Sequence, residues 1–206
     1  MNKRLVFNVS SIPVVSRIDY FSSMAFAKAG KWKYAAKSIK RYSDNIGLSS
    51  AAHYYRAGYY HQMAKQYDVA EQFYEKSYGM SLGNEKYALR YVDALVANKK
   101  LDMAVDVCRD YWAVNPHSHK VIYKLSTILR KQKKWWLEIE ALQAGLELLP
   151  DRPHRFFQLG EALEAMNRHE QAAEAFAESA KRRPSPAAFY RQGFNLEKAG
   201  NSEQAR

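Results

Sequence analysis

The feature that most constrains the fold is an internal repeat of about 34 residues. Pro116, Pro150 and Pro184 follow one another at 34-residue intervals. Gly160 and Gly193 each come three residues after a pair of adjacent aromatic residues. Self-similarity at this period indicates an array of small units that stack, because one unit alone cannot bury its apolar face.

Within a unit, the apolar residues have the spacing of an amphipathic helix. Because each helical residue turns by about 100°, the fourth, seventh, eighth and eleventh positions of a unit share one face. A small residue at the eighth position lets a second helix approach closely, and short connections such as 166–168 make the two helices antiparallel neighbours. In the second and fifth units these positions hold Tyr54, Ala57, Gly58, His61, Phe156, Leu159, Gly160 and Leu163.

This pattern resembles the tetratricopeptide repeat (TPR). The resemblance is carried by an aromatic pair, a Leu-Gly pair, a large residue, an alanine, a further aromatic residue and a proline at fixed offsets: Phe156-Phe157, Leu159-Gly160, Leu163, Ala172, Phe176 and Pro184. It extends over roughly nine-tenths of the chain. The resemblance implies an all-α fold, a right-handed α-solenoid of stacked antiparallel helix pairs.

The repeat register divides the chain into an N-terminal extension and a solenoid. The extension is 1–15 and the solenoid 16–206, with repeats at 16–50, 51–84, 85–118, 119–152, 153–185 and a partial one at 186–206. Because the last repeat stops at the opening of its second helix, we expect the solenoid to continue in a longer parent protein. Val92 and Ser126 replace the first-helix glycine and Glu138 the small second-helix residue, and we expect these departures to disturb only local packing.

The sequence contains no recognisable catalytic, cofactor-binding or metal-binding motif. It has no phosphate-binding glycine loop and no nucleophile elbow. A single cysteine, Cys108, excludes a disulfide framework and a multi-cysteine metal site. His117 and His119 lack an evident third ligand, and His169-Glu170 begins a zinc-protease motif that Ala173 breaks. We therefore predict no enzyme, cofactor or metal in this segment.

Cations and tyrosines recur at fixed positions of the first helix in successive repeats. In the TPR family this side of the first helix lines a concave groove where partners bind. The chain has a net charge of +11, and a column of cations flanked by aromatic residues suits an extended anionic partner. The candidate partner-binding residues are Arg17, Tyr20, Tyr55, Arg56, Tyr59, Lys86, Arg90, Lys120, Tyr123, Lys124, Arg130, Lys131, Tyr190 and Arg191.

A plainer interpretation of this column remains open. Charged residues on a helix surface often only keep it solvated, and first-helix aromatics often pack between repeats. The chaperone-type members of the family hold a C-terminal carboxylate with lysine and asparagine at the fifth and ninth positions. In the second repeat these positions are Tyr55 and Tyr59, so the resemblance does not imply that mode here.

A second basic region lies near the N-terminus. Residues 1–50 contain nine basic and two acidic residues, a net charge of +7. Several of the lysines fall within 28–41, which could steer an anionic chain or rest on an anionic membrane surface; a solvated basic helix is the plain alternative. The sequence has no secretion signal and no apolar stretch long enough to span a bilayer. We expect a cytoplasmic protein with peripheral contact to the inner face of the membrane.

Three functions are compatible with the sequence. The first is a non-catalytic binding module for an acidic protein segment or an anionic glycan. The second is the acceptor-polymer-binding part of a larger bacterial enzyme, because similar solenoids are fused to glycosyltransferases and polymerases that build capsule or cell-envelope polysaccharides. The third is nonspecific RNA binding through charge and stacking. Exposed solenoid ends would also allow a homo-oligomer.

Overall fold

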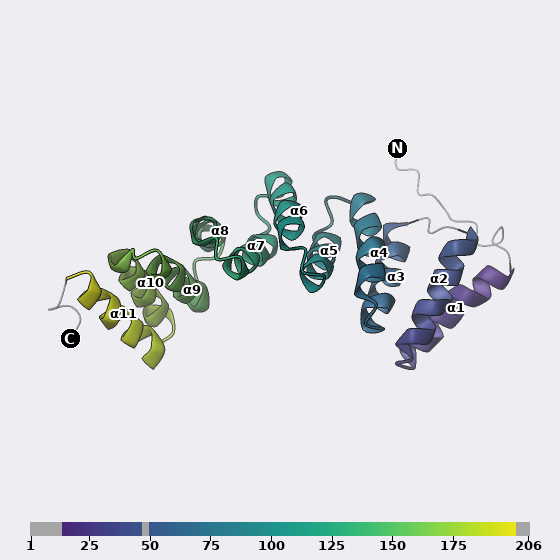
Figure 1. Cartoon of the computed structure of the whole chain (residues 1–206), viewed down its shortest axis with the longest axis horizontal. Helices are drawn as coiled ribbons and strands as arrows, with labels where there is room; N and C mark the ends of the chain where they lie inside the picture. The colour runs from purple at the N-terminus through teal and green to yellow at the C-terminus, as the bar shows by residue number, and fades with distance from the viewer. Residues whose placement is uncertain (1–13, 47–49, 201–206) are drawn as a thin grey trace. The chain divides into compact units, whose positions relative to one another are not determined.

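The computed structural model describes residues 14–46 and 50–200, and this part of the chain is helical without any strand. The predicted extension 1–15 lies almost entirely outside the described residues, as does the segment 201–206 of the last predicted repeat. The helices are α1 (Val14–Lys28), α2 (Trp32–Ile46), α3 (Ala51–Met63), α4 (Tyr67–Gly79), α5 (Glu85–Ala97), α6 (Leu101–Val114), α7 (His119–Lys131), α8 (Trp135–Leu148), α9 (Pro153–Ala165), α10 (His169–Arg182) and α11 (Pro186–Lys198) (Figure 1).

The helix starts follow the repeat period read from the sequence. Helices α3, α5, α7, α9 and α11 begin at the first residue of successive repeats. Ser50, Asn84 and Ser185 cap three of these starts, because their side chains accept hydrogen bonds from backbone N–H groups of the first turn. The predicted all-α fold of antiparallel helix pairs is confirmed.

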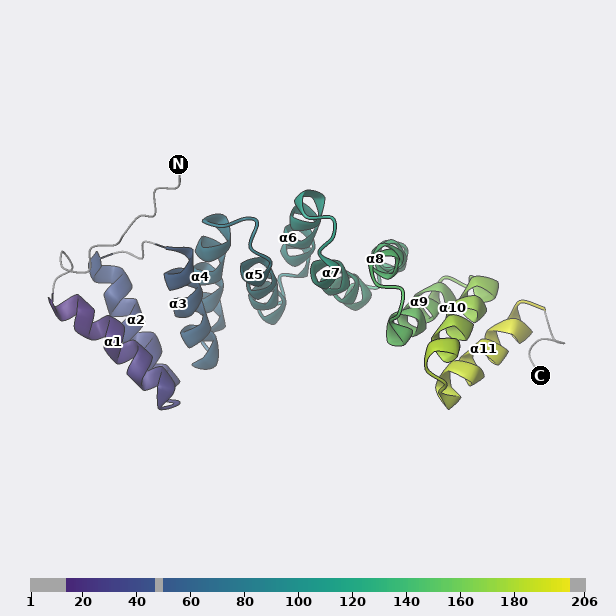
Figure 2. The same cartoon turned by 180° about the vertical axis from the view of Figure 1, so that it is seen from behind.

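The chain forms two compact units, one ending at Lys99 and the other beginning at Lys100. In the first unit, α1 packs on α2 and α3 on α4, while α2 also contacts α3 and α4 contacts α5 (Figure 2). In the second unit, α7 packs on α8 and α9 on α10, and the neighbouring helices α6, α9 and α11 extend these contacts. Each unit therefore builds its own core from helix pairs stacked in chain order.

A glycine facing an aromatic ring sets the approach of the two helices in several pairs. A Cβ atom on Gly58 would lie 2.7 Å from Tyr74 Cδ1, and one on Gly160 would lie 2.8 Å from Phe176 Cε1. Both rings are fully buried. The predicted role of the eighth position is thus confirmed in the second and fifth repeats.

The fourth repeat achieves the same closeness with the two roles exchanged. Its eighth position is Ser126, and the glycine is Gly145 on the second helix, α8. A Cβ atom on Gly145 would collide with the ring of Tyr123 from α7. Tyr123 thereby fills the space between α7 and α8, which explains how this repeat packs without a first-helix glycine.

The turn inside each helix pair contains one residue with a positive φ angle. Glycine occupies it between α1 and α2, at Gly30 (φ 70°). Lysine occupies it three times, at Lys65 (φ 62°), Lys99 (φ 62°) and Lys133 (φ 56°), and asparagine once, at Asn167 (φ 56°). A residue other than glycine in this left-handed region costs about 1 kcal/mol. Three of these turns therefore hold an exposed lysine in a conformation that glycine would adopt more easily.

Candidate partner-binding face

In the first unit, the predicted cations rest against aromatic side chains of the preceding repeat. The Arg56 guanidinium donates a hydrogen bond to the Tyr20 hydroxyl and lies 5.4 Å from the centre of the Tyr20 ring. Lys86 Nζ lies 4.3 Å from the centre of the Tyr55 ring. These contacts orient the cations without neutralising them.

Arg90 forms an ion pair with Asp93. The two side chains are 3.9 Å apart, an ion pair within one helix turn. Burial lowers the pKa of Arg90, but a hydrogen bond with Tyr55 and the negative charge of Asp93 outweigh it and raise the pKa overall. Arg90 therefore stays protonated and partly compensated.

The tyrosines of the first unit are engaged in ring packing. Tyr55 lies 5.8 Å from Tyr74 and 5.3 Å from Tyr87, measured between ring centres. Tyr20 packs on Tyr42 at 5.1 Å, and Tyr59 meets the edge of Trp32 at 5.8 Å. Their faces are thus largely occupied by neighbouring rings, as in the plainer interpretation of the aromatic column.

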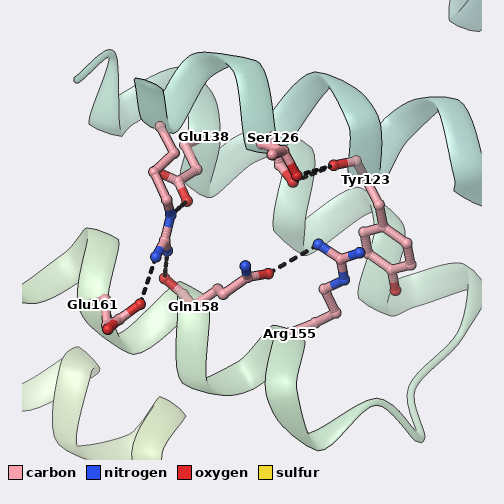
Figure 3. Close-up of polar contacts among 8 residues, drawn as sticks. Tyr123, Ser126, Glu138, Arg155, Gln158 and Glu161 are labelled. Atoms are coloured by element: carbon pink, nitrogen blue, oxygen red, sulfur yellow. Dashed lines mark hydrogen bonds and ion pairs between the residues drawn. The ribbon is translucent and has the colours of Figure 1, made fainter. Parts of the chain in front are cut away.

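In the second unit, Arg130 is tied into an internal ionic network with Glu138 and Glu161, the two carboxylates labelled in Figure 3. Its Nε donates to Glu138 Oε1 at 2.6 Å and its Nη1 to Glu161 Oε2 at 2.5 Å. Its Nη2 donates to the backbone oxygen of Gln158 at 2.7 Å. One guanidinium thus joins α7, α8 and α9. Its donors are consumed by this network, so Arg130 holds the helices together and does not lie free on the predicted face.

The same network explains the unexpected glutamate of the second helix. Glu138 is 1% exposed, and burial raises the pKa of its carboxyl although Arg130 opposes this shift. Its Oε2 atom is buried and has no hydrogen-bond partner. The residue that departs from the repeat pattern is therefore the counter-ion of Arg130.

Tyr123 also lies differently from its predicted place on the surface. It is 7% exposed, and its hydroxyl donates to the backbone oxygen of Gly145 at 2.8 Å. The guanidinium of Arg155 covers its ring, with 4.1 Å between Arg155 Cζ and the ring centre. Tyr123 is thus a core residue, and Arg155 occupies the surface above it.

Arg155 is a cation that the sequence analysis missed. Arg155 Nη1 donates to the amide oxygen Gln158 Oε1 at 2.9 Å (Figure 3), while its Nε is buried without a hydrogen bond. No carboxylate pairs with this half-buried guanidinium within the described residues. Burial, together with the charges of Arg130 and Arg152, lowers the pKa of Arg155.

The start of α9 carries two arginines, Arg152 and Arg155. Burial, followed by the charges of Arg155 and Arg152, lowers the pKa of His154. The turn has no acidic residue, and Arg152 provides no side-chain cap. A helix N-terminus favours negative charge, so this end of α9 is electrostatically suited to an anion. The clustering of Arg152, His154 and Arg155 around Pro153 was the sequence signal that could have revealed it.

The remaining predicted residues are dispersed. Arg191 of α11 donates to Glu164 Oε2 of α9 at 2.8 Å. Tyr190, also on α11, is 71% exposed, and its ring stacks on Phe194. Lys120 and Lys131 are exposed, whereas Lys124 on α7 and Arg17 on α1 are half-buried. The structure thus brings Tyr123 of α7 against Arg155 of α9, but compensates Arg130 and Arg191 internally.

Within residues 14–46 and 50–200, no group of three histidine, cysteine or acidic side chains is arranged to hold a metal ion. Cys108 is buried, and His169 Nδ1 lies 2.8 Å from Asn195 Oδ1. In the same ranges, no helix has both the length and the apolarity needed to cross a bilayer.

Comparison with solved structures identifies the architecture. MamA from Desulfovibrio magneticus RS-1, residues 41 to the end, superposes with a TM-score of 0.67 at 18% identity, covering 84% of this chain and 98% of that chain. YrrB, described as a TPR protein with an unusual peptide-binding site, gives 0.65 at 22% identity over 83% and 88%. MamA of AMB-1 gives 0.64 at 24% identity over 75% and 85%. No protein-family model and no curated protein matches the sequence.

Proposed function

Because the chain has the fold of the tetratricopeptide-repeat proteins, we propose that it is a non-catalytic binding module for an extended acidic segment of a partner protein. The segment lies on the face formed by the first helices of the pairs. YrrB, a protein of the same fold, has a peptide-binding site, which supports a peptide as the partner.

The observation that carries this proposal is the uncompensated guanidinium of Arg155. A half-buried charge without a counter-ion is costly, and a carboxylate from a partner would remove that cost through a charge-assisted hydrogen bond. Arg152 and His154 stand beside it, and Lys124 follows Tyr123, whose ring Arg155 covers. An aspartate or glutamate of the partner fits this subsite.

A peptide is favoured over a glycan or RNA because the predicted tyrosines other than Tyr190, which is 71% exposed, pack against neighbouring side chains. A sugar ring or a base would need open aromatic faces on which to stack. Tyr123 is buried beneath Arg155, and Tyr55 lies between Tyr74 and Tyr87. The polysaccharide-polymerase and RNA alternatives thereby lose one of the features that suggested them, while the cations keep their attraction for carboxylates.

The test is calorimetric titration with a mixed Asp/Glu peptide, an anionic polysaccharide and a single-stranded RNA. We expect the peptide to bind in a salt-sensitive manner. Arg155→Gln should weaken it about tenfold or more, since hydrogen bonds to charged groups contribute about 1.5–3 kcal/mol. Arg109→Gln, which removes one exposed cation from the second helix α6, is the matched control and should bind normally. Equal affinity of both variants, or binding of the polysaccharide or RNA alone, would refute the proposal.

A further inference from the structure

A basic surface on the first unit lies at the turns of its helix pairs, at the opposite ends of the helices from Tyr20 and Tyr55. The turn between α1 and α2 and the turn between α3 and α4 together form a shallow hollow of about 460 Å³. Its lining includes Lys31, Lys33 and Lys65. All three lysines are exposed, and none has an ion-pair partner among the described residues. We call these lysines and the apolar residues between them the turn surface.

Apolar side chains stand between these lysines. Tyr34 is 61% exposed and Met63 is 40% exposed, and both line the hollow with Trp32. The Tyr34 ring is supported by Phe26, 5.4 Å away between ring centres, and Trp32 is supported by Tyr59 at 5.8 Å. The turn surface therefore presents aromatic side chains that are packed on their neighbours, with exposed ammonium groups beside them.

The backbone places the cations at the tips of the turns. Lys31 N–H donates to Phe26 O at 2.8 Å and Lys65 N–H to Gln62 O at 2.9 Å, which closes both turns. Lys65 has a φ angle of 62°, which glycine would adopt at lower cost. The ammonium groups of Lys31 and Lys65 therefore belong to the turns that connect the two helices of each pair.

The structure shows which cations of the basic segment 28–41, predicted from the sequence, have an ion-pair partner. Arg41 pairs with Asp19 at 2.7 Å, and Lys40 pairs with Asp44 at 2.7 Å. Lys28 and Lys37 are exposed and, like Lys31 and Lys33, have no ion-pair partner within the described ranges. The uncompensated charge therefore gathers toward the turn, where Lys65 of the second helix pair joins it.

The second unit repeats this combination at its own turns. Lys133 and Lys134 lie in the turn between α7 and α8, and Trp136, which follows them, is 61% exposed. Arg168, from the turn between α9 and α10, lies 5.7 Å from the centre of the Trp136 ring. Cations beside an exposed aromatic residue thus recur at turns of different helix pairs.

We infer that the turn surface of the first unit docks on an anionic lipid bilayer. Lysines near such a surface are attracted by its negative potential, while aromatic side chains settle at the headgroup level and lysine stems lie along apolar surface. An acidic peptide or RNA would pair with the lysines but leave Met63 and Tyr34 in water. This inference is independent of the proposed peptide binding, because none of its residues belongs to the Arg155 subsite.

The test is flotation of the full chain with vesicles of phosphatidylcholine alone and of phosphatidylcholine mixed with phosphatidylglycerol. We expect binding to the mixed vesicles only, stronger at low salt. Replacing Lys31, Lys33 and Lys65 by glutamine should weaken partitioning about fivefold per lysine, hence about a hundredfold for the three. Tyr34→Ser with Met63→Ser should weaken it while leaving the charge unchanged.

The control removes three exposed cations from α6 and the end of α10: Arg109→Gln, Lys181→Gln and Arg183→Gln. It has the same net charge as the lysine variant and should partition several-fold better than that variant. Equal losses in both variants would show a nonspecific charge effect and overturn the inference. Binding to the neutral vesicles, or to neither kind of vesicle, would also overturn the inference. The same holds if the chain does not bind vesicles but binds RNA through these lysines. The lysine variant should still bind the acidic peptide, and Arg155→Gln should still float.

Discussion

The first-helix faces of the two units differ in how they hold their cations. In the first unit, Arg56 and Lys86 rest on phenol groups and rings, which leave the positive charge in place. In the second unit, Arg130 and Arg191 are matched by carboxylates, whereas Arg155 has no carboxylate partner among the described residues. Cations that look equivalent in a repeat register are therefore not equivalent in electrostatic terms, because their neighbours come from other repeats.

The largest effect should come from breaking the ionic network of the second unit. Arg130→Met leaves Glu138 buried without its counter-ion, and the loss of one partner of such a pair costs about 3–5 kcal/mol. We expect a loss near the lower end, since Arg130 is itself 27% exposed. Urea unfolding followed by circular dichroism measures it.

The comparison between units supplies the controls. Arg130→Met combined with Glu138→Leu should recover most of the stability, because neither charge is then buried. Arg56→Met in the first unit should cost about 1.5 kcal/mol, the low end for a hydrogen bond to a charged group, since it leaves a neutral, half-buried phenol and no buried carboxylate behind. A similar cost for Arg56→Met and Arg130→Met would contradict the contrast drawn between the two faces.

The glycine contacts should give the next largest effect, equally in both units. Gly58→Ala and Gly160→Ala place a Cβ atom within 3 Å of Tyr74 and Phe176, and overfilling a core costs about 1–3 kcal/mol. Gly79→Ala at the end of α4 meets nothing within 4 Å and should be neutral or slightly stabilising. Thermal unfolding of the three variants checks this, and a loss at Gly79 as large as at Gly160 would argue against packing as the cause.

The smallest expected effect is that the stabilities of the two units change in opposite directions as the pH falls. In the first unit, burial lowers the pKa of His61, so the unfolded chain binds protons first as the pH falls through about 6.5, and stability decreases. In the second unit, burial raises the pKa of Glu138, so the folded chain binds its proton first, and stability increases as the pH falls toward the ordinary glutamate range.

Hydrogen exchange at pH 7 and about pH 5.5, corrected for intrinsic rates, separates the two responses. We expect protection to fall in α3 and α4 and to be kept or to rise in α7 and α8. Glu138→Gln should abolish the response of α7 and α8 because it removes the titrating group. The prediction is wrong if α7 and α8 lose as much protection from exchange as α3 and α4, both in the unaltered chain and in Glu138→Gln.

The helices and their core positions could be predicted because they depend on local periodicity. A period of 34 residues fixed where α3, α5, α7 and α9 begin, and the small residue at position 58 or 160 fixed which face is buried. The aromatic column was harder to interpret, since the pattern alone does not distinguish a ring that lines a groove from one that packs, as Tyr55 does, between rings of two other helices.

The cluster of cations at the start of α9 is visible in the sequence, but the packing of Arg155 on Tyr123 could not be predicted from a single repeat. Arg155 reaches across to the ring of Tyr123, and that ring is buried only because Gly145, on a third helix, leaves room for it. The pairing of Arg130 with Glu138 and Glu161 likewise joins three helices. Such contacts follow from the order in which particular repeats stack, which a repeat pattern does not contain.

The exchanged glycine of the fourth repeat determines how this chain could be recombined. A hybrid that joined α7 to α10 would set Tyr123 against Ser179 and Ser126 against Phe176. Each ring would then face a serine where its present partner is a glycine, and both contacts would be overfilled. Joining α9 to α8 would set Gly160 against Leu142, which is smaller than Phe176, and leave a cavity. Whole hairpins of this protein are therefore the modules that can be shuffled, whereas single helices are committed to their own partner.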